Sequence, residues 1–238
     1  MKLNRDVTVR INWFLDNVVP PFLRDSRMFM GVLFWLLFRD KAARFLDFKE
    51  QAPGLGEAGL RALYKELRNS HLERDTDLNR ECLQRILSDI VGETVLDVGC
   101  GSGYVARRIA ELGLKKVAGL DTNLPQEARS DQRVQWLEGS AEFLPFATGA
   151  ADTVVCSHTL EHVVDIERAV AELRRVAAMR LIVVVPMQRE YKYTFDLHLH
   201  FFPYPFSLLK LMKNPEAICV VIGNDLYYCE ERQGQNAG

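Results

Sequence analysis

The stretch with the clearest chemical signature is "LDVGCGSGYVARRIA", residues 96–110, in which an acid is followed by alternating glycines. Its key residues are Asp97, Gly99, Gly101 and Gly103, and they fall where a β-branched run gives way to a helical pattern. Glycine lets the backbone approach a ligand closely, and the start of a helix adds free N–H groups. A dinucleotide-binding loop would require G-x-G-x-x-G, but Tyr104 occupies the last glycine position, so the spacing argues against NAD.

Two groups of histidines could in principle bind a metal. The run "HTLEH", His158 to His162, formally matches the H-x-x-E-H zinc motif, whose histidines must lie one helical turn apart. This run instead leaves a strand and precedes a helix that we expect to begin near Asp165. The residues Asp196, His198 and His200 share the spacing D-x-H-x-H. We expect no metal at either place.

The stretch "YTFDLHLHFFPYP", residues 193–205, alternates apolar and polar residues as a strand would. Three interpretations compete, namely a metal site, a structural strand and one wall of a pocket. Aromatic side chains in the N-terminal helices favour the pocket wall, and the residues to test are Tyr191, Tyr193, His198 and His200.

The elements that must position these residues follow a change of pattern along the chain. The first seventy or so residues predict helices, with a break at Pro20 and Pro21 and a loop over 52–59, and Asp75 or Thr76 is the expected N-cap of the next helix. From Thr94 onward, short β-branched runs alternate with helical stretches, which predicts an α/β fold with a parallel sheet. Two closely spaced runs near the end, "AICVVIG" and "DLYYCE", predict a hairpin at a sheet edge. We expect two domains, 1–74 and 75–238.

Composition excludes several classes of protein. The chain has 238 residues, 48% of them hydrophobic, with 30 basic against 32 acidic residues, so nucleic-acid binding is not expected. Five cysteines without a CxxC pair indicate reduced thiols and a cytoplasmic location. The apolar run over residues 28–38 is too short to span a bilayer. It predicts a buried helix, with contact at a membrane surface as the alternative.

The motifs resemble those of class I S-adenosylmethionine (SAM)-dependent methyltransferases, and of their methyltransferase type 11 group in particular. The glycine loop is similar to the first motif of that family, Asp121 to the acid that binds the ribose, "EGSAEFLPF" to the adenine loop, and "CSHTLEHVVDIERAVAELRRV" to the fourth strand and its helix. The resemblance covers roughly residues 92–186. It implies a Rossmann-like, mostly parallel seven-stranded sheet with helices on both faces, to which an N-terminal helical cap or substrate lid is added.

The resemblance also implies which residues bind SAM. Ser140 stands where the family usually has Asp, so adenine contact would depend on this hydroxyl and on the backbone of Ala141. We expect Cys100 to fill space between the glycines and not to act as a nucleophile. The implied cofactor-binding residues are Asp97, Gly99, Cys100, Gly101, Gly103, Tyr104, Asp121, Thr122, Ser140, Ala141, Ser157 and His158.

The leading hypothesis for function is a SAM-dependent methyltransferase that acts on a small, partly apolar molecule as a monomer or homodimer, without membrane contact. Candidate catalytic residues are His162, His198, His200 and Tyr193. One alternative keeps the SAM site but cyclises SAM to azetidine-2-carboxylate and releases 5′-methylthioadenosine. Another is a SAM-fold binding module without catalysis.

Overall fold

The computed structural model describes residues 11, 13–15, 18–68, 76–114, 116–126, 128–194 and 196–232. Contacts between Cα atoms divide the chain into two compact units. The first comprises Met1–Arg74 with Arg189–His200, and the second comprises Asp75–Gln188 with Phe201–Gly238. The segment Arg189–His200 thus groups with the N-terminal helices, although the sequence placed it in the second domain.

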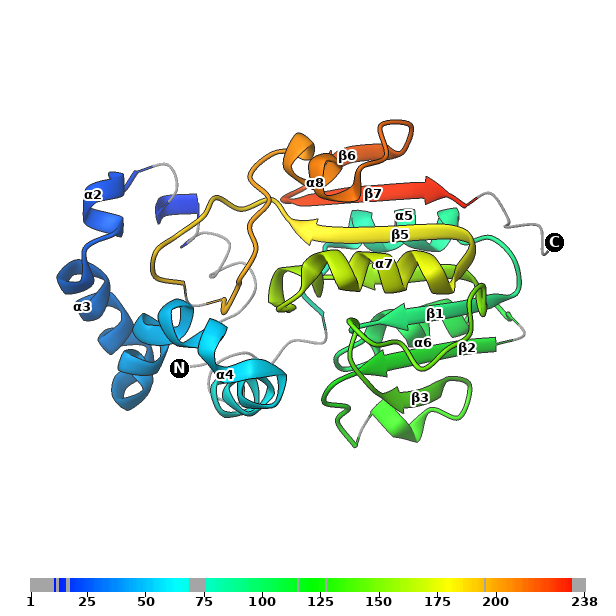
Figure 1. The fold of residues 1–238 in the computed structure, drawn as a ribbon, viewed down its shortest axis with the longest axis horizontal. Coiled ribbons are helices and arrows are strands. Elements are labelled where there is room, and N and C mark those ends of the chain that lie inside the picture. Colours follow the sequence, from blue (N-terminus) through cyan, green and yellow to red (C-terminus); the bar gives the residue numbers. More distant parts are fainter. Residues whose placement is uncertain are drawn as a thin grey trace. The chain divides into compact units, whose positions relative to one another are not determined.

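The described residues of the second unit form a seven-stranded sheet in the order β3-β2-β1-β4-β5-β7-β6 (Figure 1). The first five strands are parallel, whereas β7 runs antiparallel between β5 and β6. The predicted terminal hairpin is therefore present, and of its two strands β6 lies at an edge of the sheet. The predicted α/β class and seven-stranded sheet are confirmed. The strands are β1 (Thr94–Val98), β2 (Lys116–Asp121), β3 (Gln135–Glu138), β4 (Ala151–Ser157), β5 (Ala177–Pro186), β6 (Ile218–Ile222) and β7 (Asp225–Glu231).

Helices cover both faces of this sheet (Figure 1). On one face, α7 (Ile166–Val176) and α8 (Pro205–Met212) pack on a core that includes Val154, Val183 and Tyr228. On the other face, α5 (Arg80–Asp89) and α6 (Tyr104–Ala110) pack on Val155 and Ile182. Successive residues of β4 and β5 thus enter opposite cores, as the two-residue repeat of a strand requires.

The start of α5 corrects one prediction. Its N-cap is Asn79, whose side-chain oxygen accepts a hydrogen bond from the Cys82 N–H at 2.8 Å. The other expected cap, Thr76, accepts from the Leu78 N–H and does not cap the helix, while Asp75 lies outside the described residues. Asn79 also donates to the Ile222 carbonyl, so a contact distant in sequence selects this cap.

The first unit is helical in its described N-terminal part, with α2 (Pro21–Arg24), α3 (Arg27–Phe38), the 3-10 turn η1 (Arg39–Lys41) and α4 (Ala42–Arg68). The loop expected over 52–59 is reduced to a kink at Gly56, whose φ of 62° interrupts α4. In α3 the side chains of Met30, Phe34 and Phe38 are buried, but Met28 is 82% and Trp35 54% exposed. The predicted buried helix is therefore buried in part, because one face of α3 meets the core of the unit and the other is exposed.

Residues 193–200, the first part of the alternating stretch 193–205, do not form the predicted strand. The described residues among them have no strand geometry, and Leu197 adopts a left-handed φ of 58°. Neighbouring Tyr193 and Thr194 are both buried, which a half-exposed strand would not allow. Within the first unit the segment Arg189–His200 accepts hydrogen bonds at the Tyr191 carbonyl from Lys49 Nζ and at the Leu197 carbonyl from Tyr64 Oη, both at 2.9 Å.

Across the described ranges, no helix is both long enough and apolar enough to cross a membrane.

A buried ion pair joins α7 to β7. Arg174 donates from Nε and Nη2 to the two carboxylate oxygens of Glu230, at 2.8 and 2.7 Å, and Tyr228 Oη donates to the same group at 2.5 Å. Burial alone would raise the pKa of Glu230, but the hydrogen bonds from Arg174 and Tyr228 outweigh it and hold this pKa below its usual value. The pair therefore stabilises the fold at neutral pH.

Replacing Arg174 by Met should remove the hydrogen-bonded counter-charge of the buried Glu230 carboxylate and leave only Arg232, at 3.8 Å. We expect the free energy of unfolding to fall by about 3 kcal/mol or more, measured by urea denaturation at pH 7. The matched control is Lys213→Met, because Lys213 pairs with Glu167 on the surface at 3.3 Å and such pairs contribute about 0–1 kcal/mol. Equal losses in the two variants would contradict the assignment.

Candidate functional site

The turn between β1 and α6 brings the backbone unusually close to its neighbours. Gly99, Gly101 and Gly103 all have positive φ, at 73°, 53° and 80°, which disfavours other residues. A Cβ on Gly99 would lie 2.0 Å from Thr159 Oγ1, and one on Gly103 would lie 2.4 Å from the Trp136 ring. Glycine is therefore required here by both conformation and space.

Asp121, at the end of β2, holds this turn in place. Its Oδ2 accepts a hydrogen bond from the Gly101 N–H at 2.8 Å, and its Oδ1 accepts from the Asn123 N–H at 2.9 Å. Each carboxylate oxygen has a further lone pair, so the group can still accept bonds from two hydroxyls. The glycine loop and this acid thus form one unit at the carboxyl ends of β1 and β2.

Asp97, in β1, is completely buried, and neither of its carboxylate oxygens completes a hydrogen bond with a described residue. Burial and the negative charge of Asp121 raise the pKa of Asp97 to about 7, against a small opposing effect of the Ala106 backbone N–H. The carboxyl group therefore carries a proton part of the time at neutral pH. A positively charged or hydrogen-bonding ligand nearby would favour its ionised form.

The turn after β3 contains the predicted adenine-loop residues. Ser140 Oγ accepts from the Glu142 N–H at 3.2 Å, so its hydroxyl is used in part by its own turn. Ala141 is buried against the core, and Glu142 is buried while accepting from the backbone N–H groups of Val164 and Asp165. The acid of this loop thus joins it to the segment that precedes α7.

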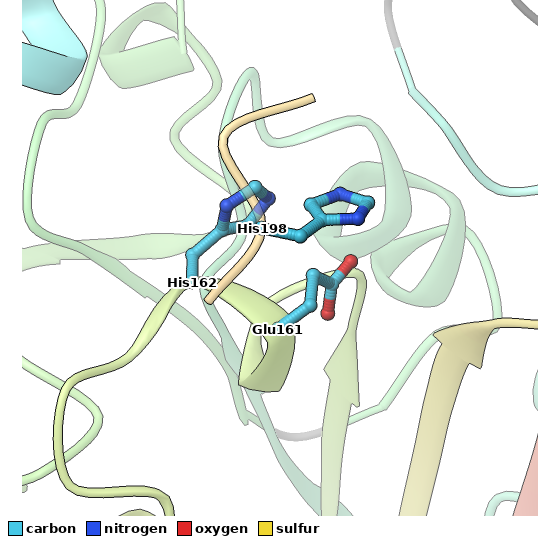
Figure 2. A group of neighbouring side chains, drawn as sticks. All are labelled: Glu161, His162 and His198. Carbon is cyan, nitrogen blue, oxygen red and sulfur yellow. The ribbon is translucent and has the colours of Figure 1, made fainter. Parts of the chain in front are cut away.

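The turn after β4 carries "HTLEH". His158 adopts a left-handed φ of 50°, and the next three-residue element is the 3-10 turn η3 (Leu160–His162), which contains Glu161 and His162 (Figure 2). His158 therefore does not share a helical turn with His162, and the spacing that a zinc motif needs is not formed by this pair. The hydroxyl of Thr159 lies against Gly99, which places this turn beside the glycine loop.

His158 lies between two buried carboxylates. Its Nε2 is 3.3 Å from Asp225 Oδ1, at the start of β7, and its Nδ1 is 3.5 Å from Glu161 Oε1. Burial alone would lower the pKa of His158, but the interactions with Asp225 and Glu161 outweigh it and raise the pKa to about 10. The imidazole is therefore a cation at neutral pH. Asn79 completes the group by donating to Asp225 Oδ2 at 2.7 Å.

The remaining predicted residues are distributed between the two units. Cys100 is buried, and burial, with Asp97 next in effect, raises the pKa of its thiol, which is unfavourable for a nucleophile. Tyr104 packs partly against the core and Thr122 is exposed, while Ser157 ends β4. The candidate catalytic residues Tyr193, His198 and His200 belong to the first unit, and their role stays a prediction.

Sequence reasoning missed four residues of this region. Thr159 and Trp136 fill the space that the absent Cβ atoms of Gly99 and Gly103 leave. Asn79 and Asp225 surround His158 from α5 and β7. Asn79 could have been found from the sequence, because asparagine is a favoured N-cap residue. The sequence near Asp225 gives no indication of its contact with His158, which lies 67 positions earlier in the chain.

Comparison with known proteins agrees with this geometry. The family described as "Methyltransferase domain" matches residues 96–180. A 2-phytyl-1,4-naphtoquinone methyltransferase of Trichormus variabilis is 36% identical over 98 residues, which cover 36% of this chain and 42% of the relative. A ubiquinone biosynthesis O-methyltransferase of Xanthomonas euvesicatoria pv. vesicatoria is 40% identical over 99 residues, 36% of this chain and 40% of the relative. The chain thus matches about two fifths of the length of these curated relatives.

Two solved structures share the fold over a larger part of the chain. A SAM-dependent methyltransferase of Thermotoga maritima is 22% identical, with a TM-score of 0.52, and the match covers 64% of this chain and 88% of that one. A Haloferax volcanii methyltransferase in complex with the Trm112 methyltransferase activator is 14% identical, also with a TM-score of 0.52, covering 76% and 96%. At these identities the likeness concerns the fold alone. Residues 96–180 of this chain therefore match the methyltransferase domain family, and the sheet has the fold of the class I SAM-dependent methyltransferases.

Proposed function

We propose that this protein is a SAM-dependent methyltransferase that transfers a methyl group to a small, partly apolar molecule. The observation that carries the proposal is the glycine loop tied to Asp121 by the Gly101 N–H, at the carboxyl ends of β1 and β2. In open α/β sheets ligands bind outside these strand ends, where the strand order reverses. Here the order reverses between β1 and β4, next to this loop.

The roles that we propose for the loop follow from its chemistry. The glycine backbone would contact the methionine part of SAM, and Asp121 would accept hydrogen bonds from the ribose hydroxyls through its remaining lone pairs. Ala141 would contribute a backbone contact to adenine, with Ser140 beside it. Once bound, SAM supplies an electrophilic methyl carbon, so the protein's task is to orient the acceptor, exclude water and accept a proton.

The acceptor is proposed as a small molecule because one matched relative is named as a naphtoquinone methyltransferase and the other as a ubiquinone biosynthesis O-methyltransferase. The matched residues 96–180 contain the proposed cofactor-binding residues, so the acceptor's structure is not inferred from them. In the reaction, a lone pair of the acceptor bonds to the methyl carbon, and the C–S bond breaks with its electrons moving to sulfur. An alcohol or phenol acceptor then loses its proton to a base.

Of the histidines His158 and His162 in the second unit, one can be excluded as the base that accepts the acceptor's proton. His158 is already protonated at neutral pH, because its raised pKa of about 10 keeps it a cation. It therefore cannot accept the acceptor's proton. His162, in η3 and partly exposed, is the base that we propose within this unit.

Loss of the Asp121 carboxylate tests the cofactor site. Asp121→Ala should weaken SAM and S-adenosylhomocysteine binding roughly tenfold to a hundredfold, since hydrogen bonds to a charged group contribute about 1.5–3 kcal/mol. Titration calorimetry measures both ligands. Glu111→Ala is the control, because Glu111 pairs with Arg108 on the surface. Failure of the unchanged protein to bind either ligand would refute the proposed function.

The nature of the reaction is tested by incubating the purified protein with SAM, first alone and then with a panel of phenols and hydroquinones. We expect SAM to persist when alone, and S-adenosylhomocysteine with a methylated product to form when an acceptor is present, as followed by LC–MS. Enzyme-dependent 5′-methylthioadenosine with azetidine-2-carboxylate would instead establish cyclisation of SAM. Binding without any turnover would favour a binding module.

The charge of His158 should be visible in the pH dependence of stability. Its pKa is about 10 in the folded protein, above its usual value near 6.5 in an unfolded chain. The resulting stabilisation is complete below pH 6.5 and is lost as pH rises toward 10. Urea midpoints measured from pH 6 to 10 should therefore fall more steeply in the unchanged protein than in His158→Gln. Parallel curves would show that His158 is not held as a cation.

A further inference from the structure

One side of α3 (Arg27–Phe38) exposes large apolar side chains. The buried residues Met30, Phe34 and Phe38 recur every four positions and pack toward α4, where the Phe38 ring stacks on that of Phe45 with 4.1 Å between centroids. At 3.6 residues per turn, the opposite side of the helix forms a second stripe. Its residues, here called the exposed stripe, are between 54% and 82% exposed, and they are Met28, Val32, Trp35 and Leu36.

The composition of this helix does not suit contact with water. A surface helix normally turns charged and polar residues outward, and a helix that is apolar all round is normally buried. Residues 28–38 contain no charged or polar residue, so α3 is apolar on the side that packs and also on the side that is exposed. The same unit exposes Trp13, Phe14 and Phe22 as well. Contiguous apolar surface of this kind marks a binding site for another apolar surface.

The unit that contains α3 is basic, whereas the rest of the chain is acidic. Residues 1–74 with 189–200 contain 15 Lys and Arg against 11 Asp and Glu, a net charge of +4 with histidine neutral. Residues 75–188 with 201–238 contain 15 against 21, a net charge of −6, and the two values give the −2 of the whole chain. Such asymmetry between two parts of a chain is typical of binding to an anionic surface.

Arginines stand at both ends of the exposed stripe. Arg27, which pairs with Asp47, has a side chain that is 54% exposed. Arg39 is also exposed, and its guanidinium lies 4.7 Å from the centroid of the Trp35 ring. The apolar surface is therefore bordered by positive charge along the helix axis.

We propose that α3 binds flat on the surface of a lipid bilayer with anionic headgroups, and that the exposed stripe enters the outer part of the hydrocarbon region. The sequence alone favoured a buried helix without membrane contact, and the exposure of this stripe leads to the alternative. With 12 residues, α3 is about 18 Å long and the hydrocarbon core is about 30 Å thick, so the helix lies in the plane of the surface. Tryptophan is typical of the boundary between headgroups and hydrocarbon, and basic residues attract anionic headgroups.

A second copy of this chain is the competing occupant of the exposed stripe. A symmetric dimer through this stripe would bring together two units that each carry a charge of +4, and repulsion opposes that contact. An anionic lipid surface is attracted by the same charge. Charge therefore favours lipid over self-association.

Vesicle flotation with the full chain tests the proposal. We expect the unchanged protein to float with vesicles of phosphatidylcholine and phosphatidylglycerol, and to bind vesicles of phosphatidylcholine alone roughly tenfold more weakly, because those lack the anionic headgroup. Raising the ionic strength from about 0.1 to about 1 M should weaken binding to the anionic vesicles, since the Debye length falls from about 10 to about 3 Å.

The double variant Trp35→Ser with Leu36→Ser removes apolar area from the exposed stripe, so vesicle binding should fall roughly tenfold or more. Its urea midpoint should stay near that of the unchanged protein, because both side chains are more than half exposed. Phe206→Ser is the matched control, because Phe206 is 66% exposed on α8 of the second unit, and it should bind vesicles as the unchanged protein does. Arg39→Gln should lower the preference for anionic vesicles.

Absence of flotation with the anionic vesicles would overturn the proposal. Equal binding by the unchanged protein and the double variant would also overturn it, as would equal losses in the double variant and in Phe206→Ser. A dimer detected by light scattering that the double variant abolishes, without vesicle binding, would assign the exposed stripe to self-association instead.

Discussion

The close approach of three backbone segments at the carboxyl ends of β1, β2 and β4 is the constraint on which the proposed site depends. In the turn that starts at Gly99, the missing Cβ of Gly99 leaves space for Thr159, which follows β4. The Gly101 N–H of the same turn donates a hydrogen bond to Asp121, at the end of β2. A side chain on Gly99 would overlap the Thr159 hydroxyl, so these segments could not keep their present positions. The parallel sheet supplies this arrangement because its strands end at one edge.

That constraint explains why this part of the fold could be predicted from sequence. Positive φ values restrict Gly99 and Gly101 to glycine, and the alternating β-branched runs mark each strand, so both signals are local. The first strand, β1, begins at Thr94, where the sequence predicts the change to β-branched runs. The terminal hairpin was also predictable, but the insertion of β7 between β5 and β6 needed the structure.

The failures have a common cause in contacts that are distant along the chain. Asn79 caps α5 while bonding Ile222 and Asp225, which no local preference for Thr76 could anticipate. The strand predicted from the apolar alternation over 193–205 is absent because burial there does not alternate: the neighbours Tyr193 and Thr194 are both buried. Side chains of α4 donate to the carbonyls of Tyr191 and Leu197 in the same unit. Burial pattern alone therefore does not distinguish a strand from an irregular segment packed on helices.

Buried charges near the glycine loop can favour a cationic ligand, which the glycine motif alone cannot do. The glycine loop offers a neutral backbone with N–H groups, which by itself does not distinguish a charged ligand from a neutral one. Among the described residues, the buried carboxyl oxygens of Asp97 complete no hydrogen bond, and burial raises the pKa of this group to about 7, so a cationic ligand nearby would favour its ionised form. Under the proposed function, the sulfonium of SAM becomes a neutral thioether after methyl transfer. Its attraction to a nearby carboxylate would then be lost. In that reaction, a negative charge at Asp97 would therefore favour the donor over its product, whereas the glycine backbone would contact both alike.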